Sequence, residues 1–372
     1  MRIAIVINTS WNIFNFRMSL AKALMAAGHE VVAIAPRDAY SEKLEAAGLQ
    51  YVPVEMENKG TNPVKDLLLI KQFHSIYKTV KPDVILQYTI KPNIYGTLAA
   101  RLAGIPVINN VSGLGTVFIV KNLVSKVALA LYKFAFLFPV KVFFQNNDDR
   151  QLFLEHNLVS EKITEVLPGS GIDTVRFKPA ENFVRHQDFR FLMISRVLYE
   201  KGIVEFVEAA KKLKAKYPEI RIQLLGSFDE AGNIGIKREA FLDWIKNGEI
   251  EYLGTSDDVA SVIAEADCVV LPSYREGTPK TLLEAAAMGK PIVTTNVPGC
   301  KETVIDNQNG YLCEVRSGED LAAKMEKVLL LPEEKLQQMG KASRTLALDK
   351  FDEKHVIGQY FKAIQQIANA KR

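Results

Sequence analysis

The stretch that decides the fold is Leu271–Pro291, which reads LPSYREGTPKTLLEAAAMGKP. The apolar run Cys268–Leu271 predicts a short strand that leads into a tight loop. We expect Thr278 to cap the following helix, with Pro279 at the first helical position, where its missing N–H costs no hydrogen bond. Thr281–Met288 is rich in Leu, Glu and Ala and predicts that helix, which a Gly-Lys-Pro sequence ends. Such a helix N-terminus suits a phosphate, because it presents free N–H groups and the positive end of the helix dipole.

Two carboxylates flank this predicted phosphate site. Glu276 precedes the helix and Glu284 lies inside it, so the helical rise places them roughly 10–12 Å apart. That separation is too large for a pair that acts on one bond as nucleophile and acid. It suits two hydroxylated groups on either side of a diphosphate, as in a nucleotide–diphosphate–sugar. A capped helix with two surface glutamates explains this stretch equally well.

The composition indicates a globular protein of two domains. The chain has 372 residues, of which 48% are hydrophobic and 24% charged. We expect no signal peptide, because MRIAIVINTS reads as a strand, and no membrane span, because no run of 18 uncharged apolar residues occurs. The three cysteines show no CxxC spacing and the five histidines are scattered, so we expect no metal site and reduced thiols in a cytoplasmic protein.

The charge is distributed unevenly. Between Val84 and Asn147 the sequence has no Asp or Glu but has Lys91, Arg101, Lys121, Lys126, Lys133 and Lys141. A basic surface on the first half is compatible with nucleic acid, an anionic membrane or a phosphorylated substrate. Because no nucleic-acid-binding motif accompanies it, we do not expect nucleic acid as a partner.

The first half alternates strands and helices, which favours a doubly wound parallel sheet. The predicted strands are Ile3–Ile7, Val31–Ala35, Tyr51–Val54, Val84–Gln87, Val107–Val111 and Lys141–Gln145, and the predicted helices are Arg17–Ala27, Pro63–Val80 and Ile94–Ala103. Ligands of such sheets bind outside the carboxyl ends of the strands. The polar and glycine-containing segments that follow these strands are therefore candidates for binding.

Three of these segments stand out. Asn8–Arg17 is predicted to be a loop without glycine, which argues against a bound dinucleotide. Its Asn, Trp and Phe side chains suit the binding of a sugar. An entry into a helix with aromatic packing explains them equally well. QYTIKPNIYG carries Lys91 and Asn93, and VSGLGTVF carries Gly113 and Gly115. At neighbouring strand ends, the latter two segments favour a functional interpretation.

The apolar segment Asn122–Phe138 predicts a helix with Lys126 and Lys133 on one face. On another face it can carry Leu123, Val127, Leu131 and Phe134. A basic helix on a membrane surface and a helix packed on the sheet remain open alternatives. After it, Asn147-Asp148-Asp149 is interpreted as the cap of a helix over residues 150–156 rather than a metal cluster.

A second series of strands and helices follows the turn sequence LPGSG at residues 167–171. Its predicted strands are Phe189–Ile194, Ile220–Leu225, Ile250–Leu253, Cys268–Leu271 and Ile292–Thr294, with a helix at Ile203–Lys216 and a terminal helix at Asp352–Ala370. Arg196 and Lys201, in SRVLYEKG, follow the first of these strands. They supply the positive charge that a helix N-terminus alone lacks for a diphosphate.

Taken together, SRVLYEKG, EGTPKTLLEAAAMGKP and the linker GIDTVRFKP resemble the retaining glycosyltransferases of family 4, over essentially the whole chain. QYTIKPNIYG and VSGLGTVF resemble the bacterial members that build glycans on undecaprenyl diphosphate, among them N-acetylgalactosaminyltransferases. The resemblance implies an α/β protein of GT-B fold, in which two Rossmann-like doubly wound parallel-sheet domains face a central cleft. It implies an acceptor-binding domain at residues 1–170 with a returning helix at 353–372, and a donor-binding domain at residues 171–352.

The resemblance also implies roles for individual residues. Arg196 and Lys201 would hold the diphosphate, and Glu276 would contact the donor sugar near the reacting carbon. The implied donor-binding residues are Glu284 at the ribose, then Gly277, Thr278, Pro279, Thr281 and Leu282, with Gly254 and Thr255 near the base. The implied acceptor-binding residues are Asn12, Asn15, Arg17, Lys91, Asn93, Gly113 and Gly115.

One departure from the family concerns the catalytic base. Many relatives carry a histidine after the fourth strand, where this sequence reads Thr89-Ile90-Lys91-Pro92-Asn93. Front-face retention, in which the leaving phosphate accepts the proton, needs no base. We therefore expect a metal-independent enzyme that is peripheral on the inner face of the cytoplasmic membrane. We expect it to move an N-acetylhexosamine, with GalNAc as the preferred candidate, from a UDP-sugar to an undecaprenyl-diphosphate-linked saccharide. The alternatives are a UDP-sugar 2-epimerase of the same architecture and a non-enzymatic nucleotide-sugar-binding protein.

Overall fold

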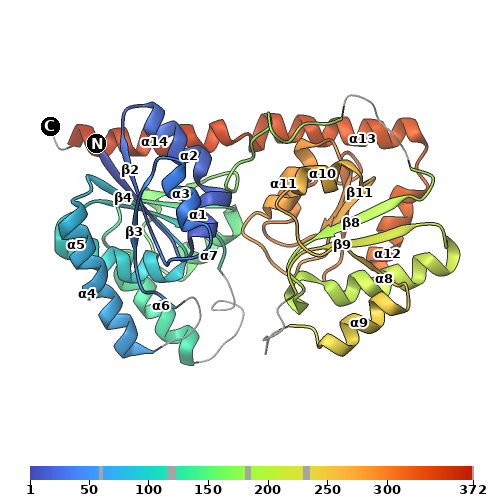
Figure 1. Ribbon diagram of the computed structural model, residues 1–372, viewed down its shortest axis with the longest axis horizontal. Helices are drawn as coiled ribbons and strands as arrows, with labels where there is room; N and C mark the ends of the chain where they lie inside the picture. Colours follow the sequence, from blue (N-terminus) through green and yellow to red (C-terminus); the bar gives the residue numbers. More distant parts are fainter. Residues whose placement is uncertain (58–61, 115–122, 181–185, 229–234, 371–372) are drawn as a thin grey trace. The chain divides into compact units, whose positions relative to one another are not determined.

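The computed structural model describes residues 1–57, 62–114, 123–180, 186–228 and 235–370 (Figure 1). The chain divides into two compact units, one of Met1–Ser170 with Glu353–Arg372 and one of Gly171–Asp352. Each unit is built on its own parallel sheet, so the predicted α/β class is confirmed. Gly115 and Lys121, to which the sequence analysis gave a role, lie outside the described residues.

Unit 1 contains a seven-stranded sheet in the order β3-β2-β1-β4-β5-β6-β7, with every neighbouring pair parallel. Its strands are β1 (Arg2–Val6), β2 (Glu30–Ala35), β3 (Gln50–Pro53), β4 (Val84–Tyr88), β5 (Val107–Val111), β6 (Lys141–Phe144) and β7 (Thr164–Val166). Its helices are α1 (Ser10–Phe16), α2 (Met18–Ala26), α3 (Ser41–Ala46), α4 (Pro63–Val80), α5 (Thr97–Ala103), α6 (Leu123–Ala135), α7 (Asn147–Glu155) and α14 (Glu353–Ala370), with the π-helix η1 (Pro92–Gly96) and the 3-10 helix η3 (Glu161–Ile163).

Unit 2 contains a six-stranded sheet in the order β10-β9-β8-β11-β12-β13. Its strands are β8 (Arg190–Ile194), β9 (Arg221–Leu225), β10 (Glu251–Tyr252), β11 (Cys268–Leu271), β12 (Ile292–Thr295) and β13 (Gly310–Cys313). Its helices are α8 (Ile203–Lys216), α9 (Arg238–Lys246), α10 (Val259–Ala264), α11 (Lys280–Ala287), α12 (Gly318–Leu329) and α13 (Glu333–Leu346), with the short turns η4 (Tyr199–Lys201), η5 (Lys301–Thr303) and the π-helix η6 (Ala347–Phe351).

The strands of unit 1 are apolar on both faces because helices cover both sides of the sheet. Along β1, Ile3 and Ile5 join one core with residues of α1, α2 and α14, while Ala4 and Val6 join the other core with residues of α4, α5 and α6. The helix α14 is held in the first core by Tyr360, whose ring centroid lies 5.0 Å from that of Phe143.

The strand order indicates the edge of each sheet at which a ligand is expected to bind. In both units the order reverses between the first and fourth strands of the sheet, namely between β1 and β4 and between β8 and β11. Parallel sheets bind ligands outside the carboxyl ends of the strands at this switch point. The segments after β1 and β4, and those after β8 and β11, are therefore the places to look for function.

Two local predictions were wrong. Asn8–Arg17 is a helix for most of its length, because Thr9 adopts an extended conformation and its hydroxyl caps α1 by accepting from the N–H of Asn12. In α6, Val127 and Phe134 are 53% and 55% exposed, on the same side as Lys126 and Lys133, while Tyr132 is buried. Val127 and Phe134 each follow a lysine by one position, a rotation of about 100° around the helix, so one broad exposed side holds all four side chains.

Candidate functional site

The loop between β11 and α11 lies at the switch point of unit 2. Pro279, not Thr278, caps the helix: its backbone is extended with ψ 116°, and α11 begins at Lys280. The Thr278 hydroxyl instead donates to the carbonyl of Gly277 at 2.9 Å. Within this first turn, the N–H of Leu282 donates to the carbonyl of Pro279 at 3.0 Å. The predicted helix N-terminus is therefore present, shifted by one residue, while its role as a phosphate site stays a prediction.

Glu276 and Lys201 form an ion pair in this loop, as the sequence positions after β8 and β11 suggested. The Lys201 Nζ lies 2.5 Å from Glu276 Oε1, and both side chains are largely buried at 17% and 15% exposed. The Ser273 hydroxyl donates to the same carboxylate oxygen at 2.7 Å. The carboxylate is thus fixed by two elements of the sheet edge.

The backbone of the Glu276 loop is held by a close approach of another loop. The N–H of Glu276 donates to the carbonyl of Pro298 at 3.1 Å. Gly299 has φ +85°, and a Cβ there would lie 2.6 Å from the carbonyl oxygen of Gly277. Only glycine fits at this point. Ser273 and Gly299 were not predicted from the sequence, since neither has a motif role of its own.

Arg196 is not brought into this cluster. Its side chain is 63% exposed and its only described ion pair is a 3.9 Å contact with Glu200. Among the described residues it therefore lies apart from the Lys201–Glu276 pair in the free protein. Its predicted role at a diphosphate stays a prediction.

Glu284 is buried in the middle of α11. It is 8% exposed, and within the described part of the chain its carboxyl has no hydrogen-bond or ion-pair partner. Burial raises the pKa of this carboxyl to about 7, while the charges of Lys280 and Arg176 act in the opposite direction. A buried carboxyl without a partner is costly, which makes this position a candidate for a ligand that donates hydrogen bonds.

The loop after β10 lies at the same edge of the sheet. Gly254 has φ +71°, and its carbonyl accepts from the N–H of Gly226 at 2.7 Å. Gly226 packs so closely on the backbone of Ser195 that a side chain has no room there. Thr255 is exposed next to this contact. The loops after β8, β9 and β10 therefore contact one another at this edge, and their predicted role at the base stays a prediction.

The corresponding edge of unit 1 carries the predicted acceptor residues in two groups. In α1, the Asn12 amide donates to Asn8 Oδ1 at 3.1 Å and the Asn15 amide donates to the Trp11 carbonyl at 2.9 Å. Arg17 follows α1 and is only 4% exposed, with its guanidinium 4.2 Å from the centre of the Tyr88 ring. These contacts keep the polar side chains after β1 at the carboxyl edge of β4.

The second group follows β4 and β5. Lys91 forms an ion pair with Asp66 at 2.9 Å. Asn93 is 1% exposed and its amide donates to the Asn110 carbonyl at 2.9 Å, so this amide is used inside the unit. Gly113 has φ +134° in the loop after β5.

The backbone after β4 carries a signal that the sequence analysis missed. Thr89 has φ +65°, which is rare for a β-branched residue, and the π-helix η1 begins three residues later. Both conformations are costly and gather at functional sites. They mark the segment after β4 more strongly than its composition did.

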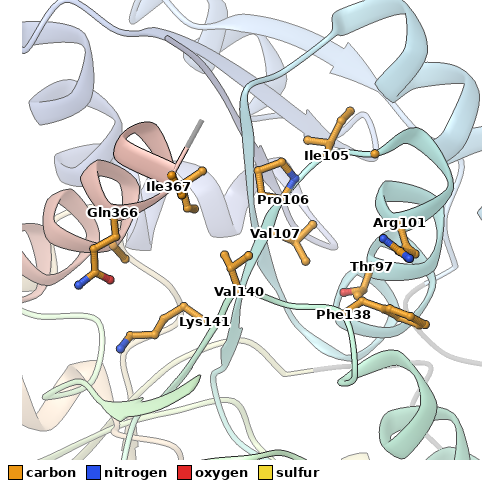
Figure 2. A pocket seen from close by; sticks show the side chains of 13 residues that line it. Thr97, Arg101, Ile105, Pro106, Val107, Phe138, Val140, Lys141, Gln366 and Ile367 are labelled. Atoms are coloured by element: carbon orange, nitrogen blue, oxygen red, sulfur yellow. The ribbon is translucent and has the colours of Figure 1, made fainter. Parts of the chain in front are cut away.

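A hollow of about 440 Å³ lies at the opposite, amino edge of the sheet in unit 1 (Figure 2). Its apolar lining includes Ile105, Val107, Phe138, Val140 and Ile367, and its basic lining residues are Arg101 and Lys141. None of the predicted site residues lines it. It is therefore separate from the ligand edge of the sheet.

No group of three or more His, Cys, Asp or Glu side chains in the described ranges is arranged to hold a metal ion. No helix in the part of the chain that the structure describes is long and apolar enough to cross a membrane.

Comparison with known proteins decides the family. The family model "Glycosyl transferases group 1" matches residues 175–346, and "Glycosyl transferase 4-like" matches residues 2–146. The chain is 33% identical, over 99% of both chains, to the N,N'-diacetylbacillosaminyl-diphospho-undecaprenol alpha-1,3-N-acetylgalactosaminyltransferase of Campylobacter jejuni. The chain belongs to the group 1 glycosyl transferases. The predicted family is confirmed.

Other relatives of this glycosyltransferase agree. An Escherichia coli UDP-Gal:alpha-D-GlcNAc-diphosphoundecaprenol alpha-1,3-galactosyltransferase is 26% identical over 68% of this chain and 67% of its own length. The Anabaena protein HepE, solved in complex with UDP, superposes with a TM-score of 0.81 at 18% identity, covering 98% of this chain and all of that one, which shows a shared fold. These comparisons confirm a transferase and give the epimerase alternative no support.

Proposed function

We propose that this glycosyltransferase moves an N-acetylhexosamine, best N-acetylgalactosamine, from a UDP-sugar to a saccharide carried on undecaprenyl diphosphate. The observation that carries the proposal is the Lys201–Glu276 pair at the N-terminal end of α11. It combines a cation, a carboxylate and a helix N-terminus at the switch point, which a sugar diphosphate requires. The names of the Campylobacter and Escherichia coli relatives both support a diphosphoundecaprenol-linked acceptor, and the Campylobacter name supports N-acetylgalactosamine.

We assign the donor site to unit 2. Lys201 and Arg196 would hold the diphosphate with the N-terminus of α11, and Glu284 would accept hydrogen bonds from the ribose hydroxyls. In the free protein Lys201 and Glu276 satisfy each other. A bound diphosphate competes for Lys201, which frees Glu276 to accept a hydrogen bond from a hydroxyl of the donor sugar. The remaining proposed contacts are Gly277, Thr278, Pro279, Thr281, Leu282, Gly254 and Thr255.

We assign the acceptor site to the carboxyl edge of unit 1. The supporting features are the polar side chains after β1 and the strained backbone at Thr89. The proposed contacts are Asn12, Asn15, Arg17, Lys91, Asn93 and Gly113. For Lys91 and Asn93 this proposal requires that the present partners Asp66 and Asn110 be exchanged or that the residues act through their backbone.

The proposed reaction retains the configuration of the sugar. The bond between the anomeric carbon and the diphosphate oxygen breaks, and the acceptor oxygen bonds to the same face of that carbon. The acceptor proton passes to the departing phosphate, which becomes UDP. Lys201, Arg196 and the helix N-terminus stabilise the charge that develops on the leaving group, so the proposed mechanism does not depend on a metal ion.

We also propose that unit 1 rests on an anionic membrane surface. The exposed face of α6 and its neighbourhood combines basic and apolar side chains, which is the pattern of a peripheral membrane contact. The exposed residues of α6 and of the turn that follows it are Lys126, Val127, Lys133, Phe134 and Leu137. Such a contact would keep the enzyme beside a lipid-linked acceptor.

The transferase assignment is tested with a panel of radiolabelled nucleotide sugars, bacterial membrane lipids as acceptor, and EDTA throughout. Label should enter the lipid phase from one UDP-sugar, and Lys201→Met should reduce this transfer about 100-fold or more. Lys212→Met is the matched control, since Lys212 is an exposed lysine of the same unit, paired with Glu319 at 3.8 Å. Interconversion of UDP-sugars without transfer to lipid would overturn the proposal, and transfer that stops in EDTA would overturn its metal independence.

The membrane contact is tested by flotation with vesicles that contain anionic lipid. Replacing Lys126 and Lys133 with glutamate should release the protein from these vesicles. Lys71→Glu, an exposed lysine on α4, is the control and should leave binding unchanged. Equal binding of both variants would refute this surface.

A further inference from the structure

Arg17 is a buried cation for which the described residues provide no counter-ion. Its residue is 4% exposed, and its Nε has no hydrogen-bond partner. Its Nη1 makes one long hydrogen bond, 3.4 Å, to the carbonyl of the adjacent Phe16. No carboxylate among the described residues forms an ion pair with it. Removing a guanidinium from water without compensation is unfavourable, so this arrangement requires a reason.

Arg17 lies at the switch point of unit 1. It separates α1 from α2, the helices that follow β1, and it stacks on Tyr88, the last residue of β4. The strands β1 and β4 are the neighbours at which the strand order reverses. The charge is therefore placed where a doubly wound sheet receives its ligand.

The surrounding sequence supplies no acid that could neutralise Arg17. No Asp or Glu occurs from Val84 to Asn147, the range that holds β4, β5, β6 and the segments between them. In the loop after β2, Asp38 is already occupied, because its carboxylate accepts from the N–H groups of Trp11 and Tyr40. The stack on Tyr88 offsets only part of the desolvation of a guanidinium.

We propose that Arg17 binds the diphosphate of the lipid-linked acceptor, through the two parallel hydrogen bonds that a guanidinium makes to phosphate oxygens. The inference rests on the proposed function, because it names the group of the acceptor that unit 1 recognises. A diphosphate supplies the negative charge that this buried cation lacks in the free protein. Arg17 thereby selects acceptors carried on a diphosphate over neutral saccharides.

The first test compares steady-state kinetics of wild type and Arg17→Met, with the lipid-diphosphate acceptor and the UDP-sugar varied separately. The KM for the acceptor should rise about ten- to one hundredfold, while the KM for the donor changes less than twofold. Arg37→Met is the matched control, because Arg37 is an exposed arginine of the same unit that also stacks on a tyrosine, 5.6 Å from the ring of Tyr51. A rise in the donor KM instead would place the donor diphosphate at Arg17 and overturn the proposal.

Thermal stability separates this binding role from a structural one. Because Arg17 is an unpaired buried charge, Arg17→Met should melt at the same temperature as the wild type or higher. A variant that melts several degrees lower and loses activity toward both substrates equally would show that Arg17 only supports the fold.

A measurement on the wild type does not depend on any variant folding. With UDP at saturation, so that the donor site is occupied, inorganic pyrophosphate should bind in calorimetry and should inhibit competitively with the acceptor. Absence of binding under these conditions would overturn the anion site even where transfer is observed. Conversely, pyrophosphate binding without any transfer would leave this site standing and refute the proposed function.

Discussion

Raising the pH from 6 to 8 should strengthen UDP binding about tenfold, and replacing Glu284 with glutamine should remove that dependence. Burial raises the pKa of Glu284 to about 7 in the free protein. The carboxyl is therefore mostly protonated at pH 6 and mostly ionised at pH 8. If the ribose hydroxyls donate to the carboxylate, they favour its ionised form and lower its pKa in the complex.

The magnitude follows from the ionised fraction of Glu284. With a pKa of about 7, roughly 9% of the carboxyl is ionised at pH 6 and roughly 91% at pH 8. Affinity that tracks the ionised form changes by the ratio of these fractions, which is about ten. Calorimetry at pH 6 in buffers of different ionisation enthalpy should detect the release of nearly one proton per UDP bound.

Glu284→Gln is the matched control, because it keeps the shape of the side chain but cannot ionise. The phosphate of UDP itself titrates near pH 6, and the variant reports this background. The same pH slope and the same proton release in wild type and variant would refute the assignment of Glu284 to the ribose.

The pH dependence of folding stability tests the same pKa of Glu284 independently. The folded pKa of Glu284 lies above its ordinary value of 4.5, so the folded protein holds this proton more tightly than the unfolded chain. That stabilisation is fully present below about pH 4.5 and is lost as the pH rises through 7, up to about 3 kcal/mol. Chemical denaturation should therefore show Glu284→Gln gaining stability relative to wild type between pH 5 and pH 8.

Three further predictions concern the framework of the site. Lys201→Met combined with Glu276→Gln should lose less activity than the sum of the single changes, measured as kcat/KM, because the two side chains are one ion pair. Gly299→Ala should destabilise unit 2 by about 2–4 kcal/mol in urea unfolding, since its Cβ would clash with the Glu276 loop. The control is Gly28→Ala, which has a similar φ but open space around it and should lower the free energy of unfolding by about 1 kcal/mol. Arg344→Met should lower the free energy of unfolding by about 3 kcal/mol in the same assay, because its guanidinium donates to three carbonyls of the linker and α11 at 2.7–2.9 Å. An unchanged urea midpoint in Gly299→Ala or in Arg344→Met would contradict the corresponding prediction.

The sequence was most informative where one local rule acts alone. Continuous apolar runs predicted most of the strands, and α4, with Pro at its first position, was predicted over Pro63–Val80 as observed. The short strands β7 and β13 were missed, because an edge strand of three or four residues carries little hydrophobic pattern. The helix α1 was missed because its Asn and aromatic residues have low helix propensity, and its cap decided the outcome.

The site could be predicted only in part, because its residues come from loops that lie far apart in the sequence. Lys201 and Glu276 lie far apart in the sequence, and only the order of the parallel strands brings their loops together. That order follows from the β–α alternation, so the pairing was within reach. Gly299 and the positive φ of Thr89 were not, since each is fixed by a neighbouring backbone segment rather than by its own sequence context.

Two buried charges that lack ion-pair partners point to ligands beyond the Lys201–Glu276 pair. Lys201 and Glu276 satisfy each other, whereas Arg17 in unit 1 and Glu284 in unit 2 are buried with no ion-pair partner among the described residues. Each unit thus bears a desolvation cost that a ligand would offset, an anion at Arg17 and hydroxyl donors at Glu284. Because Arg17 belongs to unit 1 and Glu284 to unit 2, the stabilisation by pyrophosphate and by UDP should add in thermal unfolding. Arg17→Met should remove only the first increment and Glu284→Gln should reduce only the second, whereas loss of both increments in either variant would show that the two sites are not independent.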